Sequence, residues 1–228
     1  MVTGPPDFPC DRPLTLPGPV GPLEAATLCP KDITVAATAV ILHPHPLHGG
    51  SMQNKVVTTL ARGFADLGVA GVRFNFRGVG GSGGEFAHGI GEARDALAVI
   101  EWVRRVRPDD AVWLAGFSFG AYVALRIAHE AGVAGLVTVA PAVHLYDFSA
   151  PIPPDCPWLL IQGEADEVVP VAEVRRWLSG LARPPQAVFL PGVGHFFHQR
   201  LPELRAALDG FVRDVVGRPS GRQPTSSG

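Results

Sequence analysis

Residues 116–120 of this 228-residue chain read GFSFG, a G-x-S-x-G pattern centred on Ser118. The apolar residues before it, 111–117, predict a strand, and residues 120–129 after it have the spacing of a helix. A serine on such a strand-to-helix turn is raised above the edge of a sheet, beside the free N–H groups of the helix N-terminus. The pattern therefore predicts a nucleophilic hydroxyl at Ser118, with the Phe119 N–H as one donor to an oxyanion.

A serine hydroxyl becomes nucleophilic when a base takes its proton, and a carboxylate must orient that base. Asp166 follows the expected strand at 158–162, and His195 follows the expected strand at 187–190. The carboxyl ends of parallel strands share one edge of a sheet, so we expect both side chains beside Ser118. The sequence thus predicts a catalytic triad of Ser118, His195 and Asp166.

Both partners of the serine have alternatives nearby in the sequence. Three other carboxylates also occupy loops close to these strands: Glu164, Glu167 and Asp147. His198 is a second imidazole shortly after His195. We expect His195 to be the base, because the glycine-bearing turn before it lets its ring fold inward. We expect Asp166 to be the acid. The alternative is Asp147, which would place the acid after an earlier strand, at 133–140.

The GFSFG turn, GEADEVVP at 163–170 and GVGH at 192–195 together resemble the α/β-hydrolase superfamily. ILHPHPLHGGSM at 41–52 and RFNFRG at 73–78 are similar to small, lidless bacterial serine hydrolases related to dienelactone hydrolase. Dienelactone hydrolases have a cysteine where this chain has Ser118, so their substrate is not carried over. The resemblance implies a carboxylesterase-type serine hydrolase. Such an enzyme cleaves small soluble esters, thioesters or lactones through an acyl-enzyme and needs no cofactor.

A loop rich in proline and histidine follows the expected strand at 38–42. In an α/β hydrolase this loop supplies the second oxyanion donor. Pro44 and Pro46 have no N–H, which leaves the backbone of His45 or Leu47. We expect the Leu47 N–H to donate and keep His45 as the alternative.

The same loop supports an alternative reading as a metal site. His43, His45 and His48 have the spacing of the histidine motif in metallo-β-lactamase-like hydrolases. Such sites also need an aspartate before the third histidine, where this chain has Leu47, and no later His and Asp set completes the metal shells. We therefore expect no metal. A metal-dependent hydrolase remains one alternative, and a non-catalytic binding protein on the same fold is another.

Residues 78–83 formally fit the dinucleotide pattern G-x-G-x-x-G. A dinucleotide fingerprint must open a helix, so that the helix N-terminus meets the pyrophosphate. Here residues 84–91 are expected to continue as loop. We interpret the segment as a tight turn and expect no nucleotide cofactor.

Apolar runs of strand length alternate with helical patterns, which is typical of a parallel sheet covered on both faces. We expect a single-domain α/β-hydrolase fold over residues 13–217, with about eight mainly parallel strands and helices on both faces. Residues 13–36 are expected to form an antiparallel hairpin. Residues 1–12 are interpreted as an N-terminal extension and 218–228 as a disordered tail. The proline-rich connection at 141–157 is too short for a helical insertion, so we expect no lid domain.

Composition excludes several classes of protein. Charged residues make up only 18% and the formal net charge is −2, so we expect neither nucleic-acid nor membrane binding. Apolar runs are too short to span a bilayer, and the first residues do not read as a secretory signal. Cys10, Cys29 and Cys156 are an odd number without metal-ligand spacing, which argues against a disulfide framework and fits a cytoplasmic protein. The expected partner is a small acyl substrate, and the oligomeric state stays open.

Overall fold

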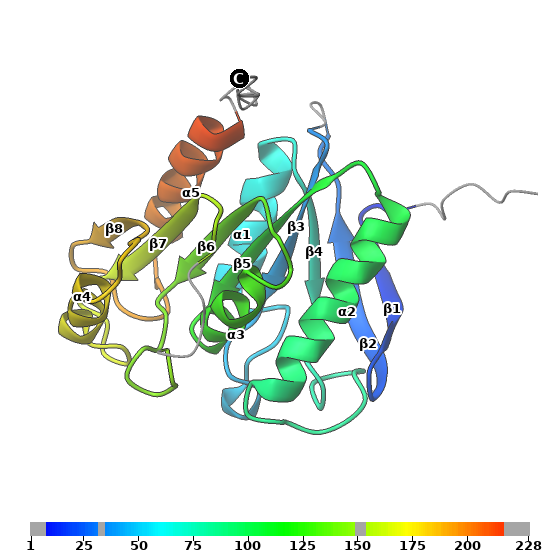
Figure 1. Cartoon of the computed structure of the whole chain (residues 1–228), viewed down its shortest axis with the longest axis horizontal. Coiled ribbons are helices and arrows are strands. Elements are labelled where there is room, and N and C mark those ends of the chain that lie inside the picture. The colour runs from blue at the N-terminus through cyan, green and yellow to red at the C-terminus, as the bar shows by residue number, and fades with distance from the viewer. Residues whose placement is uncertain (1–7, 32–34, 149–153, 217–228) are drawn as a thin grey trace, which may run out of the picture.

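The computed structural model describes residues 8–31, 35–148 and 154–216, which form one eight-stranded sheet flanked by helices (Figure 1). The strands are β1 (Pro13–Gly18), β2 (Gly21–Leu28), β3 (Ala37–Leu42), β4 (Ala70–Phe74), β5 (Ala111–Phe117), β6 (Gly135–Val139), β7 (Trp158–Gly163) and β8 (Gln186–Leu190). The helices are α1 (Lys55–Asp66), α2 (Ile90–Val106), α3 (Phe119–Ala128), α4 (Val171–Ser179), α5 (Leu201–Val216) and a short 3₁₀ helix, η1 (Pro46–His48).

The sheet has the order β1-β2-β4-β3-β5-β6-β7-β8. The hairpin β1–β2 is antiparallel and pairs antiparallel with β4, whereas the strands from β3 to β8 run parallel to one another. This arrangement confirms the predicted mainly parallel sheet of eight strands.

Helices cover both faces of the sheet, as expected. α1 and α5 pack on one face against side chains such as Ile41 and Ala115. α2 and α3 pack on the other face against the alternate side chains, such as Val40 and Leu114 (Figure 1). Every residue of β3 is buried, which explains why its sequence is a continuous apolar run instead of an alternating one.

The strand register places the ends of the parallel strands at one edge of the sheet. Leu42 of β3 lies opposite Gly116 of β5, and Gly163 of β7 lies opposite Leu190 of β8. The loops after these strands therefore leave from the same edge, at the bottom of Figure 1. All three predicted triad residues lie in these loops.

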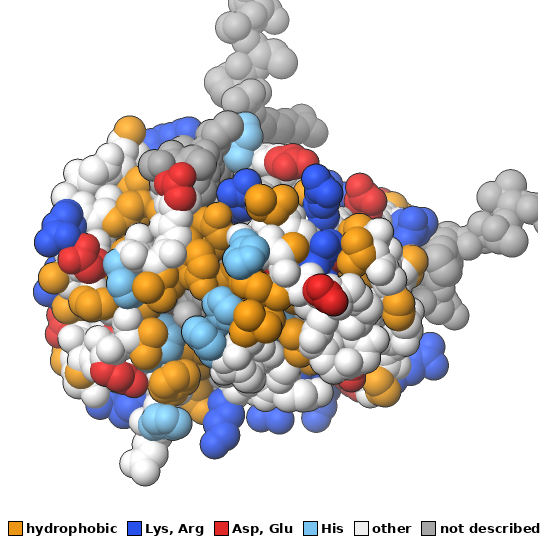
Figure 2. Space-filling model, turned by 90° about the horizontal axis from the view of Figure 1, so that it is seen from below, with side chains coloured by type: hydrophobic (Ala, Val, Ile, Leu, Met, Phe, Trp, Pro, Cys, Tyr) orange, Lys and Arg blue, Asp and Glu red, His pale blue; other side chains and the backbone are white. Residues whose placement is uncertain are grey.

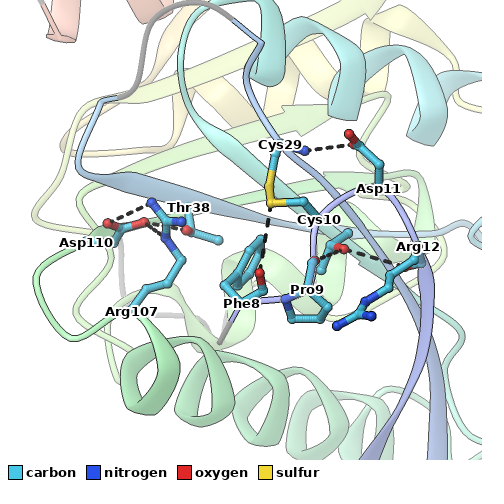
Figure 3. Close-up of a disulfide and its surroundings, with 10 residues drawn as sticks. Phe8, Pro9, Cys10, Asp11, Arg12, Cys29, Thr38, Arg107 and Asp110 are labelled. Carbon is cyan, nitrogen blue, oxygen red and sulfur yellow. Dashed lines mark hydrogen bonds and ion pairs between the residues drawn. A yellow bond between two sulfur atoms is a disulfide. The ribbon is translucent and has the colours of Figure 1, made fainter. Parts of the chain in front are cut away.

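The cysteine count was interpreted as an argument against a disulfide framework, and the structure corrects this, because Cys10 and Cys29 are bonded to each other (Figure 3). Pro13 lies opposite Ala26 in the hairpin, so the residues before β1 and after β2 come together. The Cα atoms of the two cysteines are 5.4 Å apart. Cys156 is a free thiol, and burial raises its pKa to about 11. An odd count was compatible with one pair and one free thiol.

The described part of the expected N-terminal extension packs against the C-terminal end of α2. The Phe8 ring lies 5.6 Å from the Trp102 ring, and the guanidinium of Arg107 lies 5.1 Å from the centre of the Phe8 ring. Residues 1–7 and the expected tail at 218–228 lie outside the described residues.

The described parts of the connection between β6 and β7 form no lid. These parts, residues 140–148 and 154–157, contain turns and bends but no helix. In the three described ranges, no helix combines the length and hydropathy needed to cross a membrane.

Candidate active site

Ser118 joins β5 to α3 with φ 54° and ψ −113°, a backbone conformation that is strained for a residue with a side chain. A Cβ atom on Gly116 would lie 2.2 Å from the Gly120 carbonyl oxygen, and one on Gly120 would lie 2.4 Å from the Leu42 carbonyl oxygen. Only glycine at these two positions lets β5, α3 and β3 approach so closely. The Ser118 N–H donates to the Val139 carbonyl at 2.9 Å, which anchors the turn to β6.

The structure brings the three predicted triad residues together. His195 Nε2 lies 3.2 Å from Ser118 Oγ, and His195 Nδ1 lies 2.9 Å from Asp166 Oδ2. All three residues are buried, whereas the alternative base, His198, is exposed. A carboxylate at Nδ1 favours the tautomer with the proton on that nitrogen, which leaves Nε2 to accept the serine proton.

Asp166 is held by several hydrogen bonds besides that from His195. Its Oδ1 accepts from the N–H groups of Val168 and Val169, at 2.9 and 2.6 Å. Its Oδ2 accepts from the side-chain amide of Gln162 at 3.0 Å. Gln162 was not predicted from the sequence, although a polar residue at the end of a buried apolar strand was a usable signal. The carboxylate is thus fixed in position before any substrate arrives.

The alternative acids have other partners. Glu167 accepts a hydrogen bond from the backbone N–H of His195 at 3.1 Å, so it positions the histidine loop without contacting the ring nitrogens. Glu164 forms an ion pair with Arg175. Asp147 follows β6, and the carboxylate that meets the imidazole comes from the loop after β7 instead.

The candidate oxyanion donors differ in whether their N–H groups are already used. Phe119 is the first residue of α3, so its N–H has no acceptor within the helix. The Leu47 N–H donates to Nδ1 of His45 at 3.1 Å, within η1. Among the described residues, the backbone N–H of His45 has no hydrogen-bond partner. A Cβ on Gly120 would lie 2.6 Å from the His43 carbonyl oxygen, so the backbone leading to His45 passes directly beside the start of α3.

His43 has a structural role. Its Nδ1–H donates to the Pro44 carbonyl at 2.6 Å, and its Nε2 accepts from the Phe76 N–H at 3.0 Å. Burial lowers the pKa of His43 to about 4, so the ring is neutral. The rings of His45 and His48 stack on each other with centroids 4.3 Å apart. In the part of the chain that is described, no three His, Cys, Asp or Glu side chains are arranged to hold a metal ion, and the metal alternative gains no support.

The glycine-rich segment 78–83 is a turn fastened to the hairpin. The Glu24 carboxylate accepts from the Gly81 N–H at 2.7 Å and from the Asn75 amide at 2.8 Å. α2 begins only at Ile90, so the segment does not open a helix as a dinucleotide site requires.

A cavity of about 460 Å³ opens beside Ser118 and His195. Figure 2 looks onto this edge of the molecule and shows histidine side chains gathered among hydrophobic ones. Among the described residues, those that line the cavity include no Lys, Arg, Asp or Glu. Besides the triad histidine, four rings contribute to its wall: His45, His48, Tyr146 and Phe196.

Comparison with known proteins gives the family. Residues 22–154 match the family described as X-Pro dipeptidyl-peptidase (S15 family). A lidless α/β serine hydrolase from Xanthomonas campestris is 49% identical, with 95% of this chain and 100% of that chain covered and a TM-score of 0.90. An α/β serine hydrolase homologue from Coxiella burnetii is 46% identical, with 89% and 98% covered and a TM-score of 0.87. An uncharacterized protein of Rickettsia prowazekii is 34% identical, with 78% of this chain and 79% of that protein covered.

The mainly parallel sheet, the strained serine turn and these relatives define the class of the protein as an α/β serine hydrolase. The chain belongs to the α/β-hydrolase superfamily, and within it to the S15 family that residues 22–154 match. The resemblance to the α/β-hydrolase superfamily inferred from the sequence is thereby confirmed.

Proposed function

We propose that this protein is a carboxylesterase-type hydrolase that cleaves small soluble acyl substrates through an acyl-enzyme. The observation that carries the proposal is the hydrogen-bonded series from Ser118 Oγ through the His195 ring to the Asp166 carboxylate, beside a cavity. This is the arrangement that makes a serine hydroxyl nucleophilic.

In the proposed reaction, His195 Nε2 takes the hydroxyl proton as Ser118 Oγ attacks the substrate carbonyl. Asp166 stabilises the imidazolium, and the tetrahedral intermediate collapses when His195 gives the proton to the leaving group. The acyl group then remains on Ser118. A water molecule repeats the sequence and releases the acid.

The tetrahedral oxyanion needs two N–H donors. We assign them to Phe119 and to His45, in place of the predicted Leu47. The Leu47 N–H is already used by the His45 ring, and the His45 N–H has no partner among the described residues. In this assignment Leu47 fixes the loop that presents His45.

The cavity favours an uncharged acyl substrate over a peptide. The matched family is named for an X-Pro dipeptidyl-peptidase, and recognition of a free peptide amino group favours a carboxylate in the site. The described lining residues supply no carboxylate. Esters, thioesters and lactones need carry no charged amino group, so they are compatible with a cavity whose described lining residues are uncharged.

The nucleophile is tested with a fluorophosphonate probe and with p-nitrophenyl acetate. Wild-type protein should be labelled at Ser118 and should hydrolyse the ester. Ser118→Ala should abolish labelling and lower kcat by about 10⁶-fold, because triad members act as a unit. Retained hydrolysis in a folded Ser118→Ala protein, checked by circular dichroism, would reject the proposal.

The acid is tested in the same assay. Asp166→Asn should lower kcat by about 10⁴-fold, because asparagine favours the wrong imidazole tautomer. Glu167→Gln is the matched control, since Glu167 accepts from the backbone N–H of His195 and a glutamine oxygen can keep that bond, and it should lower kcat far less. Equal losses in the two variants would contradict the assignment of Asp166.

A further inference from the structure

The rings of His45 and Tyr146 both line the cavity, from the loops that follow β3 and β6. Their ring planes are 24° from parallel and their centroids are 6.5 Å apart. Aromatic rings interact favourably at centroid separations of about 4.5–7 Å, so the two rings form one aromatic patch in the wall of the cavity.

Neighbouring groups hold both rings in place. Tyr146 stacks on Tyr122 with centroids 4.8 Å apart. Phe119, which is fully buried, lies 5.2 Å from the His45 ring and 5.4 Å from the Tyr146 ring. The Leu47 N–H donates to Nδ1 of His45, which fixes the orientation of that ring. Both rings are therefore held in place before a substrate binds, and this reduces the entropy lost on binding.

The charges around the two rings favour a neutral partner. Burial, followed by the nearby His48 imidazole, lowers the pKa of His45, so its ring is neutral near pH 7. Burial raises the pKa of Tyr146 to about 12, so its hydroxyl keeps its proton. The exposed side chains of Leu145 and Phe196 extend the apolar surface of the cavity toward solvent.

We infer that this site acts on esters that carry an uncharged aromatic ring, which packs against the rings of His45 and Tyr146 while the ester carbonyl meets Ser118. The inference rests on the proposed hydrolase function and names its substrate class. The aromatic ring belongs either to the acyl group or to the alcohol of the ester. Both positions present the same planar ring, and the ester pairs described below distinguish the two positions.

Two boronic acids that differ only in the ring test the inference without turnover. 2-Phenylethylboronic acid and 2-cyclohexylethylboronic acid both form reversible adducts with a nucleophilic serine, and calorimetry gives the Kd of each. The cyclohexyl ring is thicker and no less apolar, so burial alone gives no preference for phenyl. Contacts with two aromatic rings predict that phenyl binds wild-type protein about tenfold more tightly.

Two variants of Tyr146 locate the preference. Tyr146→Leu keeps an apolar side chain but removes one ring face, so the two Kd values should become nearly equal. Tyr146→Phe keeps the face and should keep the tenfold ratio. Labelling of Ser118 by the fluorophosphonate probe reports that both variants are folded with an intact nucleophile.

Two ester pairs separate the acyl group from the alcohol. The first is methyl 3-phenylpropanoate with methyl 3-cyclohexylpropanoate, and the second is 2-phenylethyl acetate with 2-cyclohexylethyl acetate. A phenyl preference in kcat/KM for the first pair places the ring in the acyl group. A preference for the second pair places it in the alcohol.

Equal Kd values and equal kcat/KM values in wild-type protein would overturn the inference, and Ser118 labelling would show that the hydrolase proposal still stands. A phenyl preference that survives Tyr146→Leu would also overturn it, because the ring would then bind elsewhere. Loss of both Ser118 labelling and boronic-acid binding would instead reject the proposed function, and the inference with it.

Discussion

Both ring nitrogens of His43 are bonded to backbone groups, the Pro44 carbonyl and the Phe76 N–H. The ring thereby connects the loop after β3, which carries His45, to the loop after β4. Only a neutral imidazole both donates and accepts, so protonation breaks the bond from Phe76. The position of the loop that carries the proposed oxyanion donor His45 therefore depends on a histidine that takes no part in the proposed chemistry.

We expect His43 to make the stability of the fold depend on pH. Its pKa is 6.5 in the unfolded chain and about 4 in the fold, so the unfolded state binds the proton first as the pH falls. The stabilisation is complete above pH 6.5 and is lost as the pH falls toward 4, by about 3 kcal/mol. Urea unfolding of wild-type and His43→Gln proteins at pH 7 and at pH 4.5 measures this.

His43→Gln removes the titrating group but keeps a donor and an acceptor. The difference in the free energy of unfolding between the two proteins should be large at pH 7 and smaller at pH 4.5. A difference that stays constant over this range would contradict the assignment of His43.

The grouping of Ser118, His195 and Asp166 could be predicted from the sequence because each of these residues follows an apolar run that ends at the same sheet edge. The second oxyanion donor could not be predicted in this way. Whether His45 or Leu47 has a free N–H depends on the backbone turn of η1, where the His45 ring accepts from Leu47. Tyr146 was missed because its place in the cavity wall depends on contacts with Tyr122 and Phe119. Both of these residues lie in α3, which is distant from Tyr146 in the sequence.

At the scale of elements, the path from β5 through the Ser118 turn into α3 depends on close contact with β3. The apolar runs predicted both elements, and α3 begins at Phe119, one residue earlier than expected. The order β1-β2-β4-β3 could not be read from those runs, because it is set by pairing between strands far apart in the chain. The distance from each glycine to its neighbours, which decides whether a Cβ atom would fit there, likewise depends on the folded structure and could not be predicted from the sequence.

Gly120→Ala is expected to destabilise the protein and to displace the nucleophile. The added Cβ would lie 2.4 Å from the Leu42 carbonyl oxygen, so α3 must move away from β3. Overpacking of this kind costs about 1–3 kcal/mol. Chemical unfolding measures the loss, and p-nitrophenyl acetate hydrolysis measures the effect on the site.

Gly210→Ala is the matched control. Gly210 lies within α5, and a Cβ there would meet no described atom within 4 Å. Alanine is a better helix former than glycine, so this variant should be more stable by about 0.5–1 kcal/mol. If both variants lose stability equally, the contact with Leu42 is not the cause.

At the scale of the whole molecule, the disulfide fastens the segment before β1 to the end of β2. That segment packs against the C-terminal end of α2. α2 begins at the opposite edge of the sheet (Figure 1), and the cavity beside Ser118 and His195 lies at that edge. The sequence did not reveal the pair because Cys10 and Cys29 are brought together only by the hairpin register.

Reduction of this disulfide is expected to lower the free energy of unfolding and to leave the hydrolase activity unchanged. The cross-link joins residues separated by 19 positions, and closing a loop of this size contributes about 3 kcal/mol. Urea unfolding with and without reductant measures the change. Cys156→Ser should keep the difference, and Cys29→Ser should remove it. Three reactive thiols in denatured, unreduced wild-type protein would show that the bond does not form.

The uncovered cavity has a kinetic consequence. In the described residues no helical insertion lies over Ser118, so a substrate enters and leaves without waiting for a segment of the chain to open. When acyl transfer to Ser118 is slower than both substrate release and hydrolysis of the acyl-enzyme, KM equals the dissociation constant of the substrate. Under that condition, differences in KM between substrates report how well each one fits the wall of the cavity.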